Sequence, residues 1–400
     1  MNIKVADRME HISGSVIRKF AERAAADPEL INFSNGNPSE VTFPIEDMRR
    51  FYDEALSTGY SDELMKYGVV KGFPPLTDFL KDRLHNKYGF DWDENDLFIV
   101  SGGTQAADIT SKIWLSKGDT VLVEEPSYAS CYNIFRCYEA ELKGVPINED
   151  GIDIDAVEKA LMEDDSIRMI YTIPSFQNPT GFSTSAMKRE QLYRLASKYD
   201  VIILEDDPYA ELRFSGDEIY PVKSMDTEGR VFYTSSLSKV VAPSFRLGYL
   251  VVNKRYSSYV NVCKQCTDIH SNTLAQYVAW GIMTKTDYEK HLELARSEYG
   301  RKAGLIRNEL INHMHPSCRV SSPSGGMFIM IFLPENIDAA DFVWKGIDRG
   351  VVCVPGSGFM IDGSKVSHSV RLCYATASDE EIIKGAEIIG KLTYDFIEGI

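Results

Sequence analysis

Short apolar segments alternate with longer segments of mixed polarity along the middle of the chain. Runs rich in β-branched and aromatic residues predict strands at 97–102, 120–125, 168–173, 201–206, 231–236 and 247–252. Segments of helical length separate most of them, for example 104–117, 153–163 and 185–199. Apolar strands that alternate with helices are typical of a mostly parallel sheet covered on both faces. The pattern therefore predicts an α/β core.

The pattern changes after this core. Apolar residues at three- and four-residue spacing predict long helices over 256–313. Beyond Pro323, strands are predicted at 327–334, 351–355 and 370–375, with helices near 338–349 and 378–397. The first 45 or so residues are too few to fold alone, so we expect them to pack on this C-terminal unit. The expected organisation is a large domain over 46–309 and a discontinuous small α+β domain built from 1–45 and 310–400.

Composition and charge exclude several classes of protein. The 400 residues include 43 Lys and Arg against 59 Asp and Glu, which gives a formal net charge of −16. Such a field repels nucleic acid, so no nucleic-acid partner is expected. Seven scattered cysteines do not form a disulfide framework. Cys263-x-x-Cys266 has the spacing of a metal site, but no second pair accompanies it, so no metal is expected. Since neither a secretory signal nor an apolar run of about 18 residues occurs, we expect a cytoplasmic protein without a membrane partner.

Polar side chains follow the predicted strands at the edge where ligands gather in open α/β sheets. Gly103 and Thr104 begin a helix after the first strand, which is typical of an anion site but also of a plain turn. A ring, an amide, a carboxylate, hydroxyls and two cations follow the later strands. These residues are Tyr128, Asn178, Asp206, Tyr209, Ser236, Ser238, Lys239 and Arg246.

Each of these residues alone has an ordinary structural interpretation, as a helix cap, a solvated charge or a packing residue. Together they combine groups for a phosphate with a carboxylate that needs a protonated partner of its own. Pyridoxal 5′-phosphate presents its phosphate, pyridinium nitrogen, phenolic oxygen and aldehyde at different edges of one ring. The combination therefore predicts this cofactor.

Five motifs in chain order carry a resemblance to a known family. They are Asn178-Pro179-Thr180-Gly181, Asp206-x-Pro208-Tyr209, Ser236-x-Ser238-Lys239 with Arg246-x-Gly248, Pro355-Gly356-Ser357-x-Phe359 and Arg371-x-x-Tyr374. The chain resembles the fold-type I pyridoxal-phosphate enzymes of the class I/II aminotransferase family. The resemblance implies a large domain with a mostly parallel seven-stranded sheet between helices, together with the smaller α+β domain.

The same resemblance implies roles around the cofactor ring. Lys239 would form the Schiff base with the cofactor and move a proton during the reaction, while Asp206 would pair with the pyridine nitrogen. Asn178 and Tyr209 would donate hydrogen bonds to the phenolic oxygen. Tyr128 would stack on the face of the ring.

Further residues would hold the cofactor phosphate. The backbone N–H groups of Gly103 and Thr104 are implied for this role, with the side chains of Ser236, Ser238 and Arg246. Tyr67, in Lys66-Tyr67-Gly68, matches the family tyrosine that reaches the phosphate from the neighbouring subunit. The resemblance therefore implies a homodimer with shared active sites.

Substrate contacts are implied at four positions. Arg371 would bind the α-carboxylate in a bidentate fork, with Asn178 beside it. Gly36 would lie against the substrate, although a glycine in a loop turn is an equal alternative. Ser15-Val16-Ile17-Arg18 resembles the 2-aminoadipate and kynurenine aminotransferase branch, in which the arginine reaches an acidic substrate side chain. The residues after Arg18 depart from that branch, so a solvated helix arginine stays open as the alternative.

The resulting prediction is an aminotransferase that moves the amino group of an L-amino acid to a 2-oxo acid by a ping-pong mechanism. The first alternative is a carbon–sulfur β-lyase, which uses the same fold and the same lysine, aspartate and arginine. The second is a non-catalytic cofactor-binding sensor. The acidic charge and the absence of a basic segment before the fold argue against a DNA-binding regulator.

Overall fold

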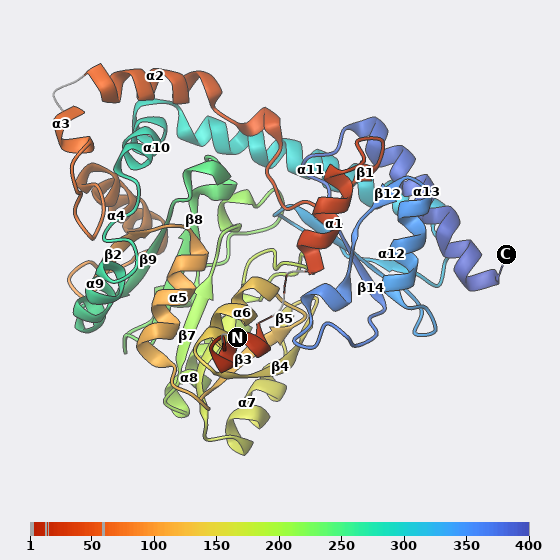
Figure 1. Ribbon diagram of the computed structural model, residues 1–400, viewed down its shortest axis with the longest axis horizontal. Coiled ribbons are helices and arrows are strands. Elements are labelled where there is room, and N and C mark those ends of the chain that lie inside the picture. The colour runs from red at the N-terminus through yellow and green to blue at the C-terminus, as the bar shows by residue number, and fades with distance from the viewer. Residues whose placement is uncertain (1–3, 13, 15, 58–60, 400) are drawn as a thin grey trace.

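The computed structural model describes residues 4–12, 14, 16–57 and 61–399. Its centre is a mixed sheet in the order β2-β9-β8-β7-β6-β3-β4-β5 (Figure 1). The members of the sheet are β2 (Asn95–Val100), β3 (Thr120–Glu125), β4 (Glu141–Asn148), β5 (Gly151–Ile152), β6 (Ile167–Thr172), β7 (Ile202–Asp206), β8 (Val231–Ser236) and β9 (Gly248–Asn253).

The inner strands β4, β3, β6, β7 and β8 are mutually parallel, whereas β9 runs antiparallel to both β2 and β8. The α/β prediction is confirmed. The sheet has one strand more than the seven expected, among the residues that the structure describes, because the two-residue β5 folds back on β4. The alternation of β4 is weak, since it lies near the edge of the sheet and most of its residues are only partly buried.

Side chains alternate between the two faces of this sheet, and each face has its own core. Leu122, Ile170 and Ile203 pack with residues of α7 (Ile154–Glu163) and α8 (Ala186–Lys198). Val123, Tyr171 and Leu204 belong to the larger core on the opposite face. Helices therefore cover both faces, as buried parallel strands require.

The helices of the large unit match the predicted segments within a few residues. The segment 256–313 divides into three helices with breaks at 266–272 and 286–287. The helices of this unit are α2 (Ile45–Ser57), α3 (Ser61–Leu64), α4 (Pro74–Tyr88), α5 (Gly103–Trp114), α6 (Ala129–Cys137), α9 (Ser257–Gln265), α10 (Thr273–Lys285) and α11 (Tyr288–His313), in addition to α7 and α8.

The C-terminal unit lies to one side of the central sheet (Figure 1). A four-stranded antiparallel sheet in the order β10-β11-β14-β13 forms its centre. Its elements are β10 (Arg319–Val320), β11 (Phe328–Phe332), β12 (Val351–Val352), β13 (Val354–Pro355), β14 (Ser369–Cys373), α12 (Ala339–Asp348) and α13 (Asp379–Glu398). The single strand predicted at 351–355 is interrupted at Cys353, because the chain changes sheets there.

The N-terminal segment contacts both units. The strand β1 (Ile31–Asn32) pairs in parallel with β12, and Phe20 of α1 (Val16–Ala25) packs on Trp344 with ring centroids 5.2 Å apart. The short helix η1 (Asp7–His11) instead lies against α6 of the large unit. Within the described residues, no helix combines the length and the apolar composition needed to cross a membrane.

Candidate active site

A cavity of about 320 Å³ opens at the carboxyl ends of the central strands, facing the C-terminal unit. It collects most of the residues that the sequence singled out, although they are spread over more than 330 positions of the chain. The lining residues are Gly36, Asn37, Gly103, Thr104, Tyr128, Ile173, Asn178, Asp206, Pro208, Tyr209, Ser236, Ser238, Lys239, Pro243, Arg246, Phe328 and Arg371.

Asp206 is the last residue of β7 and lies at the floor of the cavity, with 8% of its surface exposed. Tyr171, which lies on the neighbouring strand β6 and pairs with Leu204 of β7, donates a hydrogen bond of 3.0 Å to Asp206 Oδ2. No cation of the described chain forms an ion pair with this carboxylate. Burial therefore raises the pKa of Asp206 to about 7.

Lys239 ends a tight turn that follows β8. Ser236 closes this turn, because its hydroxyl accepts a hydrogen bond of 3.2 Å from the Ser238 N–H. The Lys239 ammonium donates to the Gly36 carbonyl across 2.7 Å, which links the large unit to the N-terminal segment. Burial lowers the pKa of Lys239 to about 8, and the charges of Arg371 and Arg246 act in the same direction.

The start of α5 and Arg246 face one another at a third edge of the cavity. The first N–H groups of a helix have no acceptor within the helix, and the helix dipole favours an anion there. Gly102 precedes α5 with a φ of +82°, and a β-carbon at this position would lie 2.9 Å from Arg246 Nη2. Arg246 Nη1 is 3.5 Å from the Ser238 hydroxyl. This edge combines the donors that a phosphate needs.

Arg371 lies on β14 of the C-terminal unit and is almost fully buried. Its guanidinium donates 3.2 Å to Asn178 Oδ1 and also donates to the Ser34 carbonyl. The Nε–H group has no hydrogen-bond partner among the described residues. Burial lowers the pKa of Arg371. The buried cation with an unused donor fits a carboxylate ligand.

Two phenols flank the cavity. Tyr209 is 5% exposed, and its ring meets that of Phe328 edge-on at 5.7 Å between centroids. Tyr128 caps α6, and burial raises the pKa of both phenols. Both therefore stay protonated at neutral pH, as hydrogen-bond donors must.

Two predicted residues lie away from the cavity of this chain. Tyr67 is 85% exposed, and its ring meets that of His270 edge-on with centroids 6.1 Å apart. Arg18 lies on α1 with its side chain 80% exposed, and pairs with Glu22 across 2.9 Å. Ser15, which begins the motif containing Arg18, is outside the described residues.

Several lining residues carry no motif that singled them out from the sequence. Asn37 and Phe328 reach the cavity through packing between elements that are distant in sequence, whereas Pro243 lies in the segment between Lys239 and Arg246. Tyr171 lies in the middle of an apolar run, so the sequence pattern predicts a buried packing residue. Its place on β6 beside the end of β7 was the available signal, because adjacent strands bring these residues together.

The charged and hydrogen-bonding groups of the cavity fit pyridoxal 5′-phosphate. The buried Asp206 lacks a cation, as a partner of a protonated ring nitrogen should. The start of α5 with Arg246 accepts a dianion, the Lys239 amine reaches the same cavity, and Arg371 has an unused donor. In contrast, no group of three or more metal-ligating side chains lies together in the part of the chain that the structure describes.

Comparison with known proteins defines the class. Residues 28–389 match the family described as aminotransferase class I and II, so the chain belongs to this family. The enzyme is a pyridoxal-phosphate-dependent aminotransferase with fold type I. Amino-group transfer is supported, whereas β-elimination and a sensor role are not.

Individual relatives and solved structures show which aminotransferases the chain resembles. The chain is 33% identical to aromatic-amino-acid aminotransferase 1 of Thermococcus litoralis over 361 residues, 89% of this chain and 86% of the relative. It superimposes on a Pyrococcus horikoshii kynurenine aminotransferase with a TM-score of 0.93 and 32% identity, covering 98% and 97% of the two chains. An α-aminoadipate aminotransferase from Thermus thermophilus gives a TM-score of 0.89 at 28% identity, covering 99% and 98%.

Proposed function

We propose that this aminotransferase uses Lys239, Asp206 and Arg371 as its central residues and works by ping-pong exchange. An L-amino acid would give up its amino group and leave as a 2-oxo acid, and a second 2-oxo acid would then receive the group. The observation that carries the proposal is the convergence of an amine, a cation-free buried carboxylate and a buried guanidinium on one cavity. Its partners are small molecules, an amino acid and a 2-oxo acid.

Lys239 is proposed to move the proton. Bound pyridoxal 5′-phosphate supplies an aldehyde that condenses with amines and a ring that takes up the electron pair left at the substrate α-carbon. The Lys239 amine would accept the α-proton and deliver it to the C4′ position. A pKa of about 8 leaves an appreciable neutral fraction near neutral pH, which suits a general base.

Asp206 is proposed to keep a proton on the ring nitrogen. A paired positive charge returns the carboxylate to its ionised form, and Tyr171 holds it in place by the hydrogen bond to Oδ2. Tyr209 and Asn178 would donate to the phenolic oxygen, and Tyr128 would cover one face of the ring. These contacts fix the ring relative to the Lys239 amine.

The phosphate and the substrate carboxylate would occupy separate cationic edges. Gly103, Thr104, Ser236, Ser238 and Arg246 are proposed for the phosphate. Arg371 would bind the α-carboxylate with Asn178 beside it, and Gly36 would leave space for the substrate. The two separated positive edges would orient the substrate relative to the cofactor, because one holds the cofactor phosphate and the other holds the substrate carboxylate.

A second cavity supports a proposal for the substrate side chain. It adjoins the first through Asn37 and Pro243, and its lining includes Phe43, Ile45 and Met48. Glu40 is the one ionisable residue among its described lining. We propose that it receives an aromatic or other long uncharged side chain, in line with the names of the T. litoralis and P. horikoshii relatives.

Arg18 is proposed as the contact for an acidic donor. The three cations on the main cavity already have roles, so a second carboxylate needs a residue from elsewhere. The exposed pair of Arg18 with Glu22 is weak, because exposed ion pairs contribute less than about 1 kcal/mol.

A homodimer is proposed because apolar side chains are exposed between residues 41 and 69. Val41, Ile45, Leu56, Met65 and Val69 are each more than half exposed, and Tyr67 lies among them. A second copy covering this segment would remove apolar surface from water and bring Tyr67 to the partner's phosphate edge. We also propose the division into 46–309 and a small domain of 1–45 with 310–400, which the β1–β12 pairing supports.

A half-reaction tests the proposed function. Purified enzyme with bound cofactor is mixed with an amino acid and no 2-oxo acid. We expect a single equivalent of 2-oxo acid per active site, followed by regeneration when a second oxo acid is added. Sustained release of ammonia and pyruvate from cysteine-type substrates would contradict the proposal.

Light scattering tests the proposed homodimer. We expect the mass of two chains, and the mass of one chain would contradict the proposal.

A further inference from the structure

A partly buried ionic cluster lies directly behind the wall of the active site, with about a fifth of the Arg83, Lys87 and Glu211 side chains exposed. Its centre is the carboxylate of Glu211, in the short helix η3 (Ala210–Leu212) that follows Tyr209. Arg83 donates to Glu211 Oε1 through Nε at 3.0 Å and through Nη2 at 2.6 Å. Lys87 lies 3.6 Å from the same oxygen, and the Tyr288 hydroxyl is 3.3 Å from Oε2.

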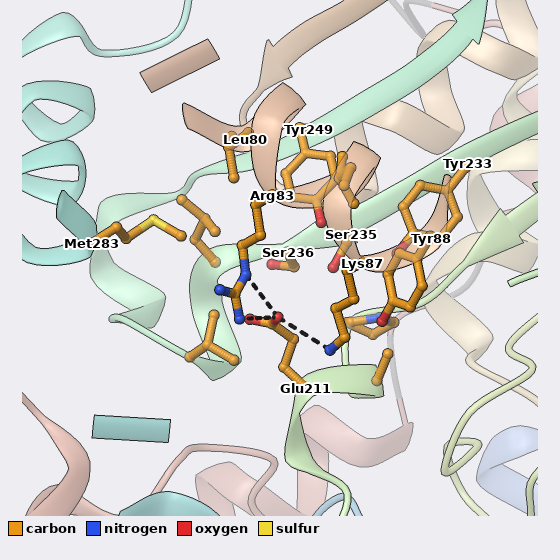
Figure 2. Close-up of a pocket in the computed structure, with 15 residues that line it drawn as sticks. Leu80, Arg83, Lys87, Tyr88, Glu211, Tyr233, Ser235, Ser236, Tyr249 and Met283 are labelled. Carbon is orange, nitrogen blue, oxygen red and sulfur yellow. Dashed lines mark hydrogen bonds and ion pairs between the residues drawn. The ribbon is translucent and has the colours of Figure 1, made fainter. Parts of the chain in front are cut away.

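The cluster connects three elements through one side chain. Arg83 and Lys87 come from α4, Tyr288 begins α11, and Glu211 belongs to the loop after β7. Figure 2 shows Arg83 and Lys87 directed toward Glu211, with Ser235 and Ser236 beside them. A further contact from α11 holds the backbone, because Arg296 Nε donates 2.8 Å to the Glu211 carbonyl.

The positive charges around Glu211 lower its pKa by more than burial raises it. Burial alone would raise the pKa of this carboxyl, but Arg83 and Lys87 hold the pKa below its ordinary value. Glu211 is therefore ionised across the working pH range. A charged acceptor with a two-nitrogen contact to arginine fixes its partners more firmly than a neutral hydrogen bond does.

The cluster and the active site share a wall. A small cavity of about 20 Å³ lies beside Glu211, and Pro208 and Ser236 line both this cavity and the active-site cavity. Pro208 directly precedes Tyr209, and Glu211 follows it by two residues. A shift of Glu211 would therefore move the backbone of Tyr209, whose side chain lines the active-site cavity.

We propose that Glu211 is a positioning residue that acts through Tyr209. Its ion pairs with α4 fix the loop after β7, so that the phenol keeps its hydrogen bond to the cofactor's phenolic oxygen. The inference rests on the proposed role of Tyr209. A donor at the phenolic oxygen stabilises its anionic form, and losing that donor raises the pH at which the bound cofactor changes its visible absorbance.

A double-mutant cycle on the holoenzyme tests the proposal, with the pH midpoint of visible absorbance as its readout. Glu211→Gln keeps the shape of the side chain and removes its charge. We expect an upward shift of about half a pH unit or more in this variant, and a larger one in Tyr209→Phe. The double variant should match Tyr209→Phe alone, because Glu211 has nothing left to position.

Glu289→Gln is the matched control. Glu289 also pairs with Arg83, across 2.5 Å, but its side chain is 56% exposed and, among the described residues, forms no hydrogen bond or ion pair with the loop after β7. The pH midpoint of visible absorbance in Glu289→Gln should equal that of the unaltered enzyme. A merely structural effect of disturbing Arg83 would instead shift both variants.

Two results would overturn this inference and leave the proposed role of Tyr209 intact. One is an unshifted pH midpoint in Glu211→Gln. The other is a shift from Glu211→Gln that is as large in the Tyr209→Phe variant as in the unaltered enzyme. An unshifted Tyr209→Phe would overturn the proposed role of Tyr209 and this inference with it. If Glu211→Gln does not fold, Tyr288→Phe takes its place, since it removes only the hydroxyl that contacts Oε2. A smaller upward shift is then expected, and its absence overturns the proposal.

Discussion

Asp206 is the residue whose electrostatic state depends most on the bound cofactor, and Asp206→Asn isolates this dependence. In the cofactor-free protein, burial raises the pKa of Asp206 from 3.8 to about 7. The folded protein therefore holds this proton up to a higher pH than the unfolded chain does. The contribution of Asp206 to stability must fall as the pH rises from about 4 to about 7, because the unfolded state releases its proton first.

The size of the effect follows from the shift. With about 1.4 kcal/mol for each pKa unit, the raised pKa of Asp206 lowers the stability of the folded protein by up to roughly 4 kcal/mol above pH 7, and by about 2 kcal/mol at pH 5, where only the unfolded chain is ionised. Asparagine carries no such charge and still accepts the Tyr171 hydrogen bond. Between pH 5 and pH 8, Asp206→Asn should therefore gain roughly 2 to 3 kcal/mol relative to the unaltered protein.

Melting of the cofactor-free proteins measures this gain. A chain of this length unfolds with a large entropy change, so the gain corresponds to about 3 °C in the difference between the two melting temperatures. Adding pyridoxal 5′-phosphate should reverse the order at pH 8, because only aspartate pairs with the ring nitrogen. Activity should fall by about 100-fold or more in the variant. A melting difference that is equal at both pH values would refute the reasoning.

Glu205→Gln is the control for that experiment. Glu205 is the neighbouring carboxylate on β7, is fully buried, and burial raises its pKa to about 7 as well. It accepts hydrogen bonds from the backbone N–H groups of Val222 and Lys223 and does not line the cavity. Its substitution should alter the pH dependence of stability and leave the affinity for the cofactor unchanged.

Three further substitutions test separate parts of the site. Arg371→Lys should raise the KM for the amino acid by about 100-fold without changing cofactor affinity, because lysine lacks the bidentate fork; steady-state kinetics and cofactor titration measure the two. Gly248→Ala should lower the melting temperature and cofactor affinity, since its β-carbon would lie 2.6 Å from the Ser235 carbonyl beside the Ser236 turn. Arg18→Ala should raise the KM for 2-aminoadipate about tenfold and leave aromatic donors unaffected; equal values for both donors would remove Arg18 from the substrate site.

Sequence pattern predicted the strands that are buried on both faces, together with the edge strand β2, and missed β4 and β5 at the opposite edge of the central sheet. The strands β3, β6, β7 and β8 are continuous apolar runs, and each lies within a residue of its expected place. In contrast, β4 is half exposed and carries polar residues on both faces, so it has no clear period. The change of sheet at Cys353 depends on which strands are neighbours, and a local pattern contains no such information.

The candidate site divides in the same way. Residues at strand ends could be found because the topology of parallel sheets places all such ends at one edge. Phe328 and Glu211 could not, because each reaches its place through packing between elements distant in sequence. Arg83 lies 128 positions from Glu211, and an arginine on a helix reads as an ordinary surface residue until its acceptor is known.

The three central ionisable groups share one electrostatic feature. Burial raises the pKa of Asp206 and lowers the pKa of both Lys239 and Arg371, so each is driven toward its neutral form in the absence of ligand. A chain with a net charge of −16 thus keeps two desolvated cations and a lone carboxylate in one cavity. The cofactor supplies the missing counter-charges, an anionic phosphate and a protonated ring nitrogen, and the substrate adds a carboxylate. Binding should therefore stabilise the fold as it assembles the site, because the same charges that weaken the empty cavity attract its ligands.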